Sequence, residues 1–221
     1  MKRILSTLVL AASLLLPAVA AEAASGIYVA PKFVMSDYNL GTVSRSNNLH
    51  GYGVGSEDYW TFGGSIAVGY DFFYEQMIPL RAEFEFALRS NASQNWSGSR
   101  GKVESEWNTK TSFLNLYWDF HNSSDFVPYI GAGIGMAHQY ASYDIKQGDY
   151  KESMDENYTT FAWNAGIGVA YNINPNLAID LGYRFVGLGN HEVSQKTRDG
   201  EYSIKTSPYS NEFSVGARFN F

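Results

Sequence analysis

Glu83 and Glu85 are the residues whose type and spacing come nearest to acid–base chemistry. In an extended segment they share one face and stand about 7 Å apart, a distance set by the rise of a strand. Arg81 and Arg89 share that face, which favours structural ion pairing of the two carboxylates. We therefore expect charges that neutralise each other rather than a pair of catalytic acids.

His121 and Ser123 form the only close Ser–His candidate for a nucleophilic site. They lie in a short polar turn whose sequence matches no catalytic motif. The other histidines, at positions 50, 138 and 191, are scattered, and no two of them have metal-ligand spacing. We therefore predict that the chain is not an enzyme and binds neither a metal nor a cofactor.

The composition narrows the class of protein further. The chain has 221 residues, of which 16% are aromatic, 17% are charged and none is cysteine, whereas soluble domains average about 25% charged residues. The absence of cysteine excludes a disulfide scaffold and a cysteine nucleophile. A net charge of -6 argues against nucleic-acid binding, and the many aromatic residues argue against disorder.

The N-terminus has the features of an export signal. Lys2 and Arg3 precede an apolar run over residues 4–16, and Pro17 ends that run. Small-x-small patterns then predict cleavage after Ala20 or Ala23. The alternative, an N-terminal membrane anchor, fits less well because the run is short. We predict a signal peptide over residues 1–23 and a single barrel domain over residues 24–221.

The rest of the chain alternates with period two, which is the pattern of β-strands. Between residues 79 and 90, for example, Leu80, Phe84 and Leu88 share one face, whereas Arg81 and Glu85 share the other. Eight segments alternate in this way, at about residues 26–36, 59–72, 79–90, 109–120, 127–142, 159–173, 177–187 and 209–221.

The connections between these segments alternate between short and long. Short links are expected at residues 73–78, 121–126 and 174–176, and long polar links at 37–58, 91–108, 143–158 and 188–208. Short turns on one side and long loops on the other are typical of an outer-membrane barrel. An even number of strands places both termini on the short-turn side, the periplasm.

A soluble β-sandwich or lipocalin-like barrel also alternates, but it turns its apolar face inward. Here the second face is small or charged, and aromatic residues mark both ends of the apolar face, including Trp60, Tyr70, Phe72, Trp118, Phe120, Phe161, Trp163, Tyr171, Phe213 and Phe221. Two aromatic girdles around an apolar band indicate lipid outside. We predict an all-β, eight-stranded, antiparallel up-and-down transmembrane β-barrel.

Three segments resemble a known family. Residues 212–221 are similar to the C-terminal signature of bacterial outer-membrane proteins, and residues 127–135 and 176–184 resemble the fifth and seventh strands of opacity-protein and OmpA/OmpX-type barrels. The resemblance implies an integral protein of the cell outer membrane, in contact with membrane lipid and lipopolysaccharide. It also implies an assembly signal, read by the barrel-assembly machinery, at Phe213, Val215, Ala217, Phe219 and Phe221.

The inward face predicts a lumen closed by side chains. It carries five cations and six carboxylates: Lys32, Arg81, Arg89, Arg184 and Arg218, and Asp71, Glu83, Glu85, Asp119, Asp180 and Glu212. Side chains fill the lumen of an eight-stranded barrel, and buried charges are costly unless paired. We expect an ion-pair network joined by Asn115, Tyr117, Tyr129 and Asn164.

The alternative function is a small porin with a narrow ion pore, for which Gly131, Gly133 and Gly135 would leave the space. A lipid-modifying enzyme is a third possibility, using His121 and Ser123.

The long loops are the best candidate functional surface, because binding residues concentrate on loops carried by a rigid scaffold. Trp96, Arg100 and Trp107 are candidate contacts in the second long loop. The family resemblance implies a surface antigen or adhesin that contacts a host surface or matrix ligand, and we expect the protein to be a monomer. The other interpretation of the loops is simple solvation beside lipopolysaccharide.

Overall fold

The computed structural model describes residues 26–39, 44–45, 58–98, 101–147, 150–197 and 200–221. The predicted signal peptide and its two cleavage positions therefore lie outside the described residues. Among the helices of the described part, none is long and apolar enough to cross a membrane.

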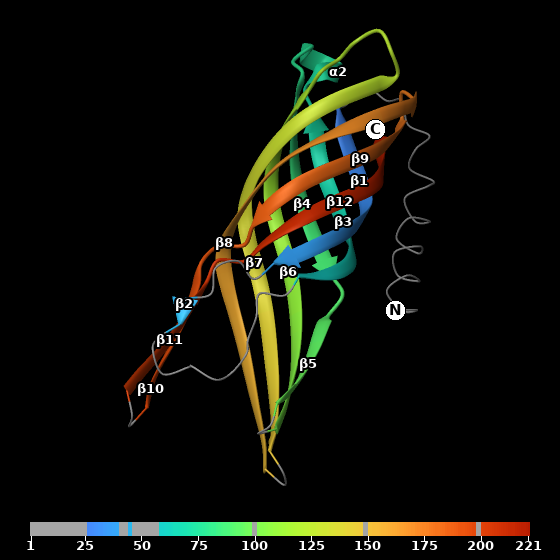
Figure 1. Cartoon of the computed structure of the whole chain (residues 1–221). Coiled ribbons are helices and arrows are strands. Elements are labelled where there is room, and N and C mark those ends of the chain that lie inside the picture. Colours follow the sequence, from blue (N-terminus) through green and yellow to red (C-terminus); the bar gives the residue numbers. More distant parts are fainter. Residues whose placement is uncertain (1–25, 40–43, 46–57, 99–100, 148–149, 198–199) are drawn as a thin grey trace.

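Eight antiparallel strands close into a barrel, as the period-two pattern predicts (Figure 1). Each barrel strand pairs with the next, and β1 pairs with β12 to complete the ring. The strands are β1 (Ile27–Asn39), β3 (Asp58–Asp71), β4 (Leu80–Arg89), β6 (Gly101–Asp119), β7 (Phe126–Gln147), β8 (Tyr150–Asn174), β9 (Leu177–Gly187) and β12 (Tyr209–Asn220).

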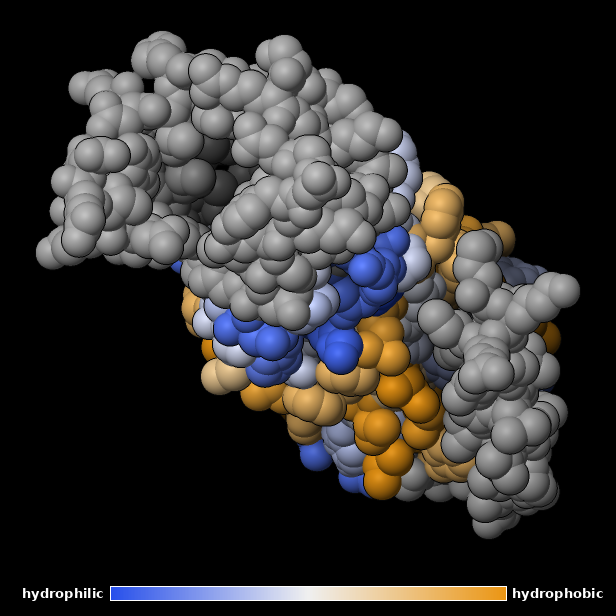
Figure 2. Space-filling model, turned by 90° about the horizontal axis from the view of Figure 1, so that it is seen from below, coloured by the Kyte–Doolittle hydropathy of each residue, from blue (hydrophilic) through white to orange (hydrophobic). Residues whose placement is uncertain are grey.

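The barrel is apolar outside and polar inside, which excludes the soluble alternatives. The lipid-facing side chains Leu114 and Ile134 are 62% and 60% exposed, whereas Glu85 and Asn115 on the inner face are 1% and 2% exposed. Figure 2 shows a patch of orange, apolar side chains on the visible part of the outer wall. A soluble barrel would hide these groups, so this surface fits only a lipid environment.

Short connections join the strands at one end of the barrel. The first contains a single helical turn, α2 (Phe73–Gln76), where the period-two analysis expected a plain turn. The turn ends at Met77, whose φ of 56° is left-handed, a conformation that commonly terminates a helix. The C-terminus lies at the same end of the molecule (Figure 1).

At the other end, two of the links expected as long loops are instead strands. β6, β7 and β8 continue as one paired sheet out to Lys102↔Lys146 and Gln147↔Tyr150. β5 (Ala92–Gly98) pairs with the start of β6. These extensions lack the apolar alternation that marks the lipid-facing part, so periodicity did not reveal them, although ladder hydrogen bonds need no apolar face.

A second sheet accompanies the fourth long link. β10 (His191–Thr197) and β11 (Gly200–Thr206) form a hairpin, and β2 (Ser44–Arg45) pairs with β11. Both groups of hairpins project from the end of the barrel opposite α2 (Figure 1). Beyond the barrel, the residues that the structure describes are therefore largely β-structure.

Candidate functional site

The middle of the lumen contains a chain of buried ion pairs that begins on β4 and β1. Lys32 Nζ lies 2.7 Å from Glu83 Oε1 and 3.1 Å from Glu85 Oε2. Tyr28 and Tyr117 donate hydrogen bonds to the two oxygens of Glu83. One ammonium group thus pairs with both glutamates that stood out in the sequence, and this arrangement leaves neither as an obvious proton donor.

The chain of ion pairs continues across the lumen to β9 and β12. Arg184 Nη2 lies 2.7 Å from Glu85 Oε1 and 2.8 Å from Glu212 Oε2. Glu212 also pairs with Arg89, whose Nε donates to Oε1 at 2.8 Å, and accepts a hydrogen bond from Ser36. Cations and carboxylates alternate along the whole chain of ion pairs, so each charged group lies next to groups of the opposite sign.

A separate ion pair lies nearer to α2. Arg81 donates to both oxygens of Asp119, with Nε–Oδ2 at 2.6 Å and Nη2–Oδ1 at 2.9 Å. Its guanidinium lies 4.8 Å and 5.0 Å from the ring centres of Tyr117 and Tyr129. The aromatic faces add cation–π stabilisation in a place that is shielded from water.

Three of the eleven predicted network residues do not join these ion pairs and have other neighbours: Asp71, Asp180 and Arg218. Tyr129 donates to Asp180 at 2.5 Å, and the backbone N–H of Phe73 donates to Asp71 at 3.0 Å. Arg218 lies 5.6 Å from the ring centre of Tyr28, and its Nε and Nη1 have no hydrogen-bond partner among the described residues. These groups belong to the α2 end of the lumen, where tyrosines and backbone replace ionic partners.

The inward-facing glycines of β7 lie against side chains of β6. Gly131, Gly133 and Gly135 stand in register with Tyr117, Asn115 and Phe113 of β6, respectively. A Cβ added at each glycine would collide with the side chain of its partner. The β6 side chains therefore lie over the glycines and fill the space that the pore hypothesis required.

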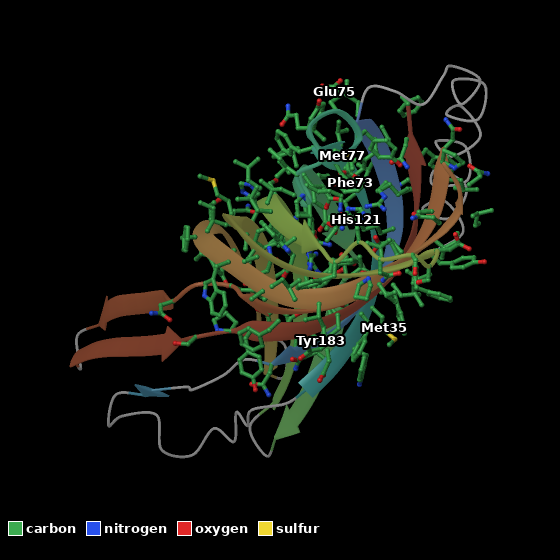
Figure 3. All side chains as sticks on the ribbon, turned by 90° about the horizontal axis from the view of Figure 1, so that it is seen from above. Met35, Phe73, Glu75, Met77, His121 and Tyr183 are labelled. Carbon is green, nitrogen blue, oxygen red and sulfur yellow. The ribbon has the colours of Figure 1, made fainter. Side chains whose placement is uncertain are left out.

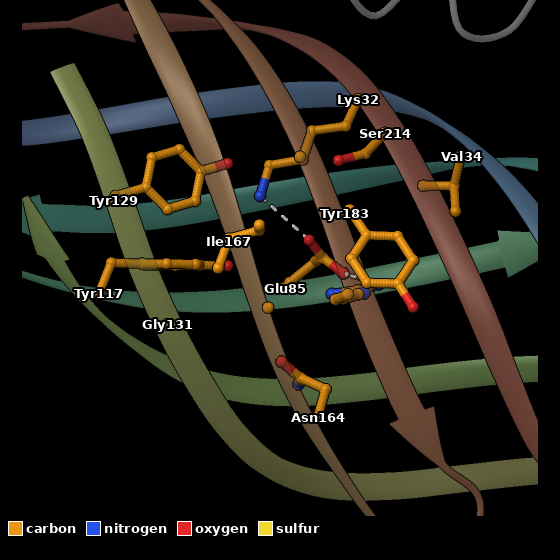
Figure 4. Close-up of a pocket in the computed structure, with 13 residues that line it drawn as sticks. Lys32, Val34, Glu85, Tyr117, Tyr129, Gly131, Asn164, Ile167, Tyr183 and Ser214 are labelled. Atoms are coloured by element: carbon orange, nitrogen blue, oxygen red, sulfur yellow. Dashed lines mark hydrogen bonds and ion pairs between the residues drawn. The ribbon is translucent and has the colours of Figure 1, made fainter.

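A small cavity remains beside the ion pairs (Figure 4). It has a volume of about 30 Å³ and is lined by residues that include Lys32, Glu85, Tyr129, Asn164 and Arg184. A cavity needs about 10–15 Å³ to hold one water molecule. This cavity therefore has room for water beside the ion pairs.

An apolar cluster closes the lumen at the hairpin end. Its fully buried members are Tyr38, Phe113, Ala137, Ala162, Val186 and Leu188, which we call the apolar cap. The hydroxyl groups of Tyr38 and Tyr158 both donate to Oε1 of Gln139, at 3.2 Å and 2.9 Å. Tyr38 on β1 and Gln139 on β7 come from opposite walls, so their contact spans the lumen.

The remaining candidate for an enzyme site, the pair His121 and Ser123, lies at the α2 end of the barrel. The ring of His121 stacks on Phe73 with 3.7 Å between ring centres, and the two lie together in Figure 3. Ser123 is exposed. Partial burial raises the pKa of Tyr74, whose hydroxyl accepts a hydrogen bond from Asn220. His121 thus acts as a packing partner of α2, and within the described residues no three His, Asp or Glu side chains are grouped to hold a metal ion.

Known proteins are similar to this chain in sequence and in fold. Residues 6–221 match the family described as outer membrane protein beta-barrel domain. The chain belongs to this family. Its sequence is 30% identical over 220 residues to outer membrane protein PagN of Salmonella typhimurium, covering 91% of this chain and 92% of PagN.

Two further similarities support membership of the outer-membrane barrel family. The chain is 25% identical over 193 residues to opacity protein opA67 of Neisseria gonorrhoeae, covering 71% of this chain and 76% of that protein. The fold resembles that of Neisserial surface protein A, with a TM-score of 0.54, 22% identity, and coverage of 89% and 98% of the two chains. The predicted family resemblance and location in the outer membrane are therefore confirmed.

The predicted assembly signal of this outer-membrane barrel lies on one face of the last strand. Phe213 and Val215 are 45% and 44% exposed on the outer face of β12, and Ala217 and Phe219 follow on the same face. Phe221 directly follows β12, and its backbone N–H donates to Ile27 at 2.9 Å. The reading of this face by the assembly machinery stays a prediction.

The candidate loop contacts belong to the projecting sheet of the outer-membrane barrel. Trp96 lies on β5 opposite Val103, and Trp107 lies on β6 opposite Ala92. Arg100 lies outside the described residues. The backbone register therefore places the two tryptophans beyond the membrane-spanning part of the barrel, and their contacts with a ligand stay a prediction.

Proposed function

We propose that this outer-membrane barrel is a surface adhesin or antigen that acts mainly through its extracellular β7–β8 hairpin, and that its closed lumen serves as a rigid support. The observation that carries this proposal is the length of β7 and β8, at 22 and 25 residues. A tilted strand crosses the membrane with about 9–11 residues. About half of this hairpin is therefore available above the bilayer.

The register at the tip of the sheet suggests the chemistry of a partner. Position 102 pairs with position 146, position 146 pairs with position 151, and all three carry lysine. Directly opposed like charges destabilise a sheet, and the next row on the same face pairs the acidic positions 104 and 144. We propose that the lysine row takes part in adhesion by contacting anionic groups on a host surface.

The adhesin proposal is tested by shortening the hairpins in register. Removing residues 142–155 and joining Ala141 to Glu156, its partner in the ladder, through Asn-Gly shortens the β7–β8 hairpin without altering the barrel. The matched control removes residues 193–204 and joins Glu192 to Lys205, which also pair. We expect cells displaying the first variant to lose attachment to cultured epithelial monolayers and cells displaying the control to keep it. Undiminished attachment of the first variant would contradict the role of this hairpin.

The closed lumen is tested by the conductance of the refolded chain in planar bilayers. The apolar cap, the chain of ion pairs and the filled glycine positions support the expectation of no stable current steps. A heat-dependent shift on electrophoresis confirms folding beforehand. Stable steps from folded protein that change in Arg184→Ala would overturn the proposal and favour the small-porin alternative.

A further inference from the structure

Two basic side chains stand next to each other on the outer face of the barrel. Lys110 of β6 pairs in register with His138 of β7, and His138 pairs with Thr159 of β8. All three residues are exposed. Strand alternation places them on the face that carries Leu114 and Ile134, which is the face toward lipid.

This row marks the extracellular edge of the apolar band. One row nearer to the periplasm, Ser112, Met136 and Phe161 stand in register, and the last two are 57% and 62% exposed. One row farther out, the register aligns Asn108, Tyr140 and Asn157. Lys110 and His138 therefore stand where the apolar surface gives way to polar residues, at the level of the lipid headgroups.

The local geometry suits a shared anionic ligand. Cross-strand partners have Cβ atoms about 4.5–5.5 Å apart, so the ammonium group of Lys110 and the ring of His138 reach one common group. His138 Nδ1 lies 2.9 Å from Thr159 Oγ1, and this contact orients the ring. A phosphate oxygen accepts charge-assisted hydrogen bonds from such donors.

The charges around the row favour an anion. The nearest carboxylate on this face of β6 is Glu106, which stands two rows farther out and accepts a hydrogen bond from Asn91. On the other side of the barrel, β1 places Asp37 opposite Trp60 at the corresponding edge. The extracellular edge of the apolar band is therefore basic over β6 and β7 and acidic at β1.

We propose that Lys110, His138 and Thr159 bind a phosphate group of lipopolysaccharide in the outer leaflet. The lipid A headgroup of lipopolysaccharide carries phosphates at this depth, beside the acyl chains that cover Met136 and Phe161. A lipid bound at this site holds one side of the barrel at a fixed depth in the membrane and limits its rotation. The inference rests on the outer-membrane location and is independent of the adhesin proposal.

The experiment compares thermal unfolding in defined bilayers. The full mature chain is refolded into phosphatidylcholine vesicles with and without purified bisphosphorylated lipid A, and Tm is followed by tryptophan fluorescence. We expect lipid A to raise Tm, the double variant Lys110→Gln/His138→Gln to lose most of that rise, and Lys110→Arg to keep it. Asp37→Asn, a charge change at the same level of the opposite wall, should keep the full rise.

Two further lipids identify the chemical group. Dephosphorylated lipid A should give little rise in Tm for the unaltered chain, and phosphatidylglycerol at equal charge should give a smaller rise that the double variant shares. An equal rise in the unaltered chain and the double variant with bisphosphorylated lipid A would overturn the site. If the double variant does not refold, the Lys110→Gln single variant carries the same comparison.

Discussion

The apolar cap and the chain of ion pairs close the same lumen by different physical means. Six buried residues form the cap and depend on packing, which is not directional. In the chain of ion pairs, Glu85 is shared by Lys32 and Arg184, and Glu212 by Arg184 and Arg89. Losing one cap residue leaves a space, whereas losing Glu212 leaves the buried Arg89 without its carboxylate and leaves Arg184 with Glu85 alone.

The largest effect is expected from Glu212→Ala. This change leaves Arg89 and Arg184 facing each other without their shared carboxylate, and breaking a buried pair costs about 3–5 kcal/mol. Urea unfolding of the refolded barrel in lipid vesicles, followed by tryptophan fluorescence, measures the loss. A loss below about 1 kcal/mol, the size of an exposed pair, would show that water replaces the carboxylate.

Leu188→Ala tests the apolar cap. Leu188 is 1% exposed, and truncation of a buried leucine costs about 2–5 kcal/mol. We expect the lower half of that range, since the cap lies at the hairpin end where water can enter the new space. The same unfolding assay applies, and a loss larger than that of Glu212→Ala would reverse the proposed ranking of the two regions.

Gly133→Ala tests how tightly side chains fill the lumen between these regions. The new Cβ would lie 2.7 Å from Asn164 Nδ2, and overpacking costs about 1–3 kcal/mol. Ala132→Val, on the lipid-facing side of the same strand, should leave the free energy of unfolding nearly unchanged. Equal effects of the two changes would mean that the inner wall is as loosely packed as the lipid face.

Glu75→Gln should have the smallest effect. The Glu75 carboxylate accepts a hydrogen bond from Tyr70 at 2.6 Å in an exposed position at the α2 end, where water replaces a lost partner. The unfolding midpoint should stay within the error of the measurement. A clear drop would show that charges outside the lumen also support the barrel.

The sequence by itself determined the face of each residue in the barrel strands. Period two is a local property, so Leu114 and Asn115 fall on opposite sides of the wall whatever their neighbours are. Apolar alternation located all eight barrel strands, and the alternation of short and long links indicated their connection. Beyond the apolar band this signal ends, which is why the continuation of β6, β7 and β8 was missed.

The tertiary structure alone decided which inward-facing groups meet. Arg89 and Glu212 are 123 residues apart in the chain, and they meet only because β1 pairs with β12 and closes the ring. The same closure joins Glu85 to Arg184, leaves Arg218 beside Tyr28, and places the β6 side chains over the glycines of β7. A residue's face follows from its own strand, but its partner depends on the register and stagger of all eight strands, which no local pattern specifies.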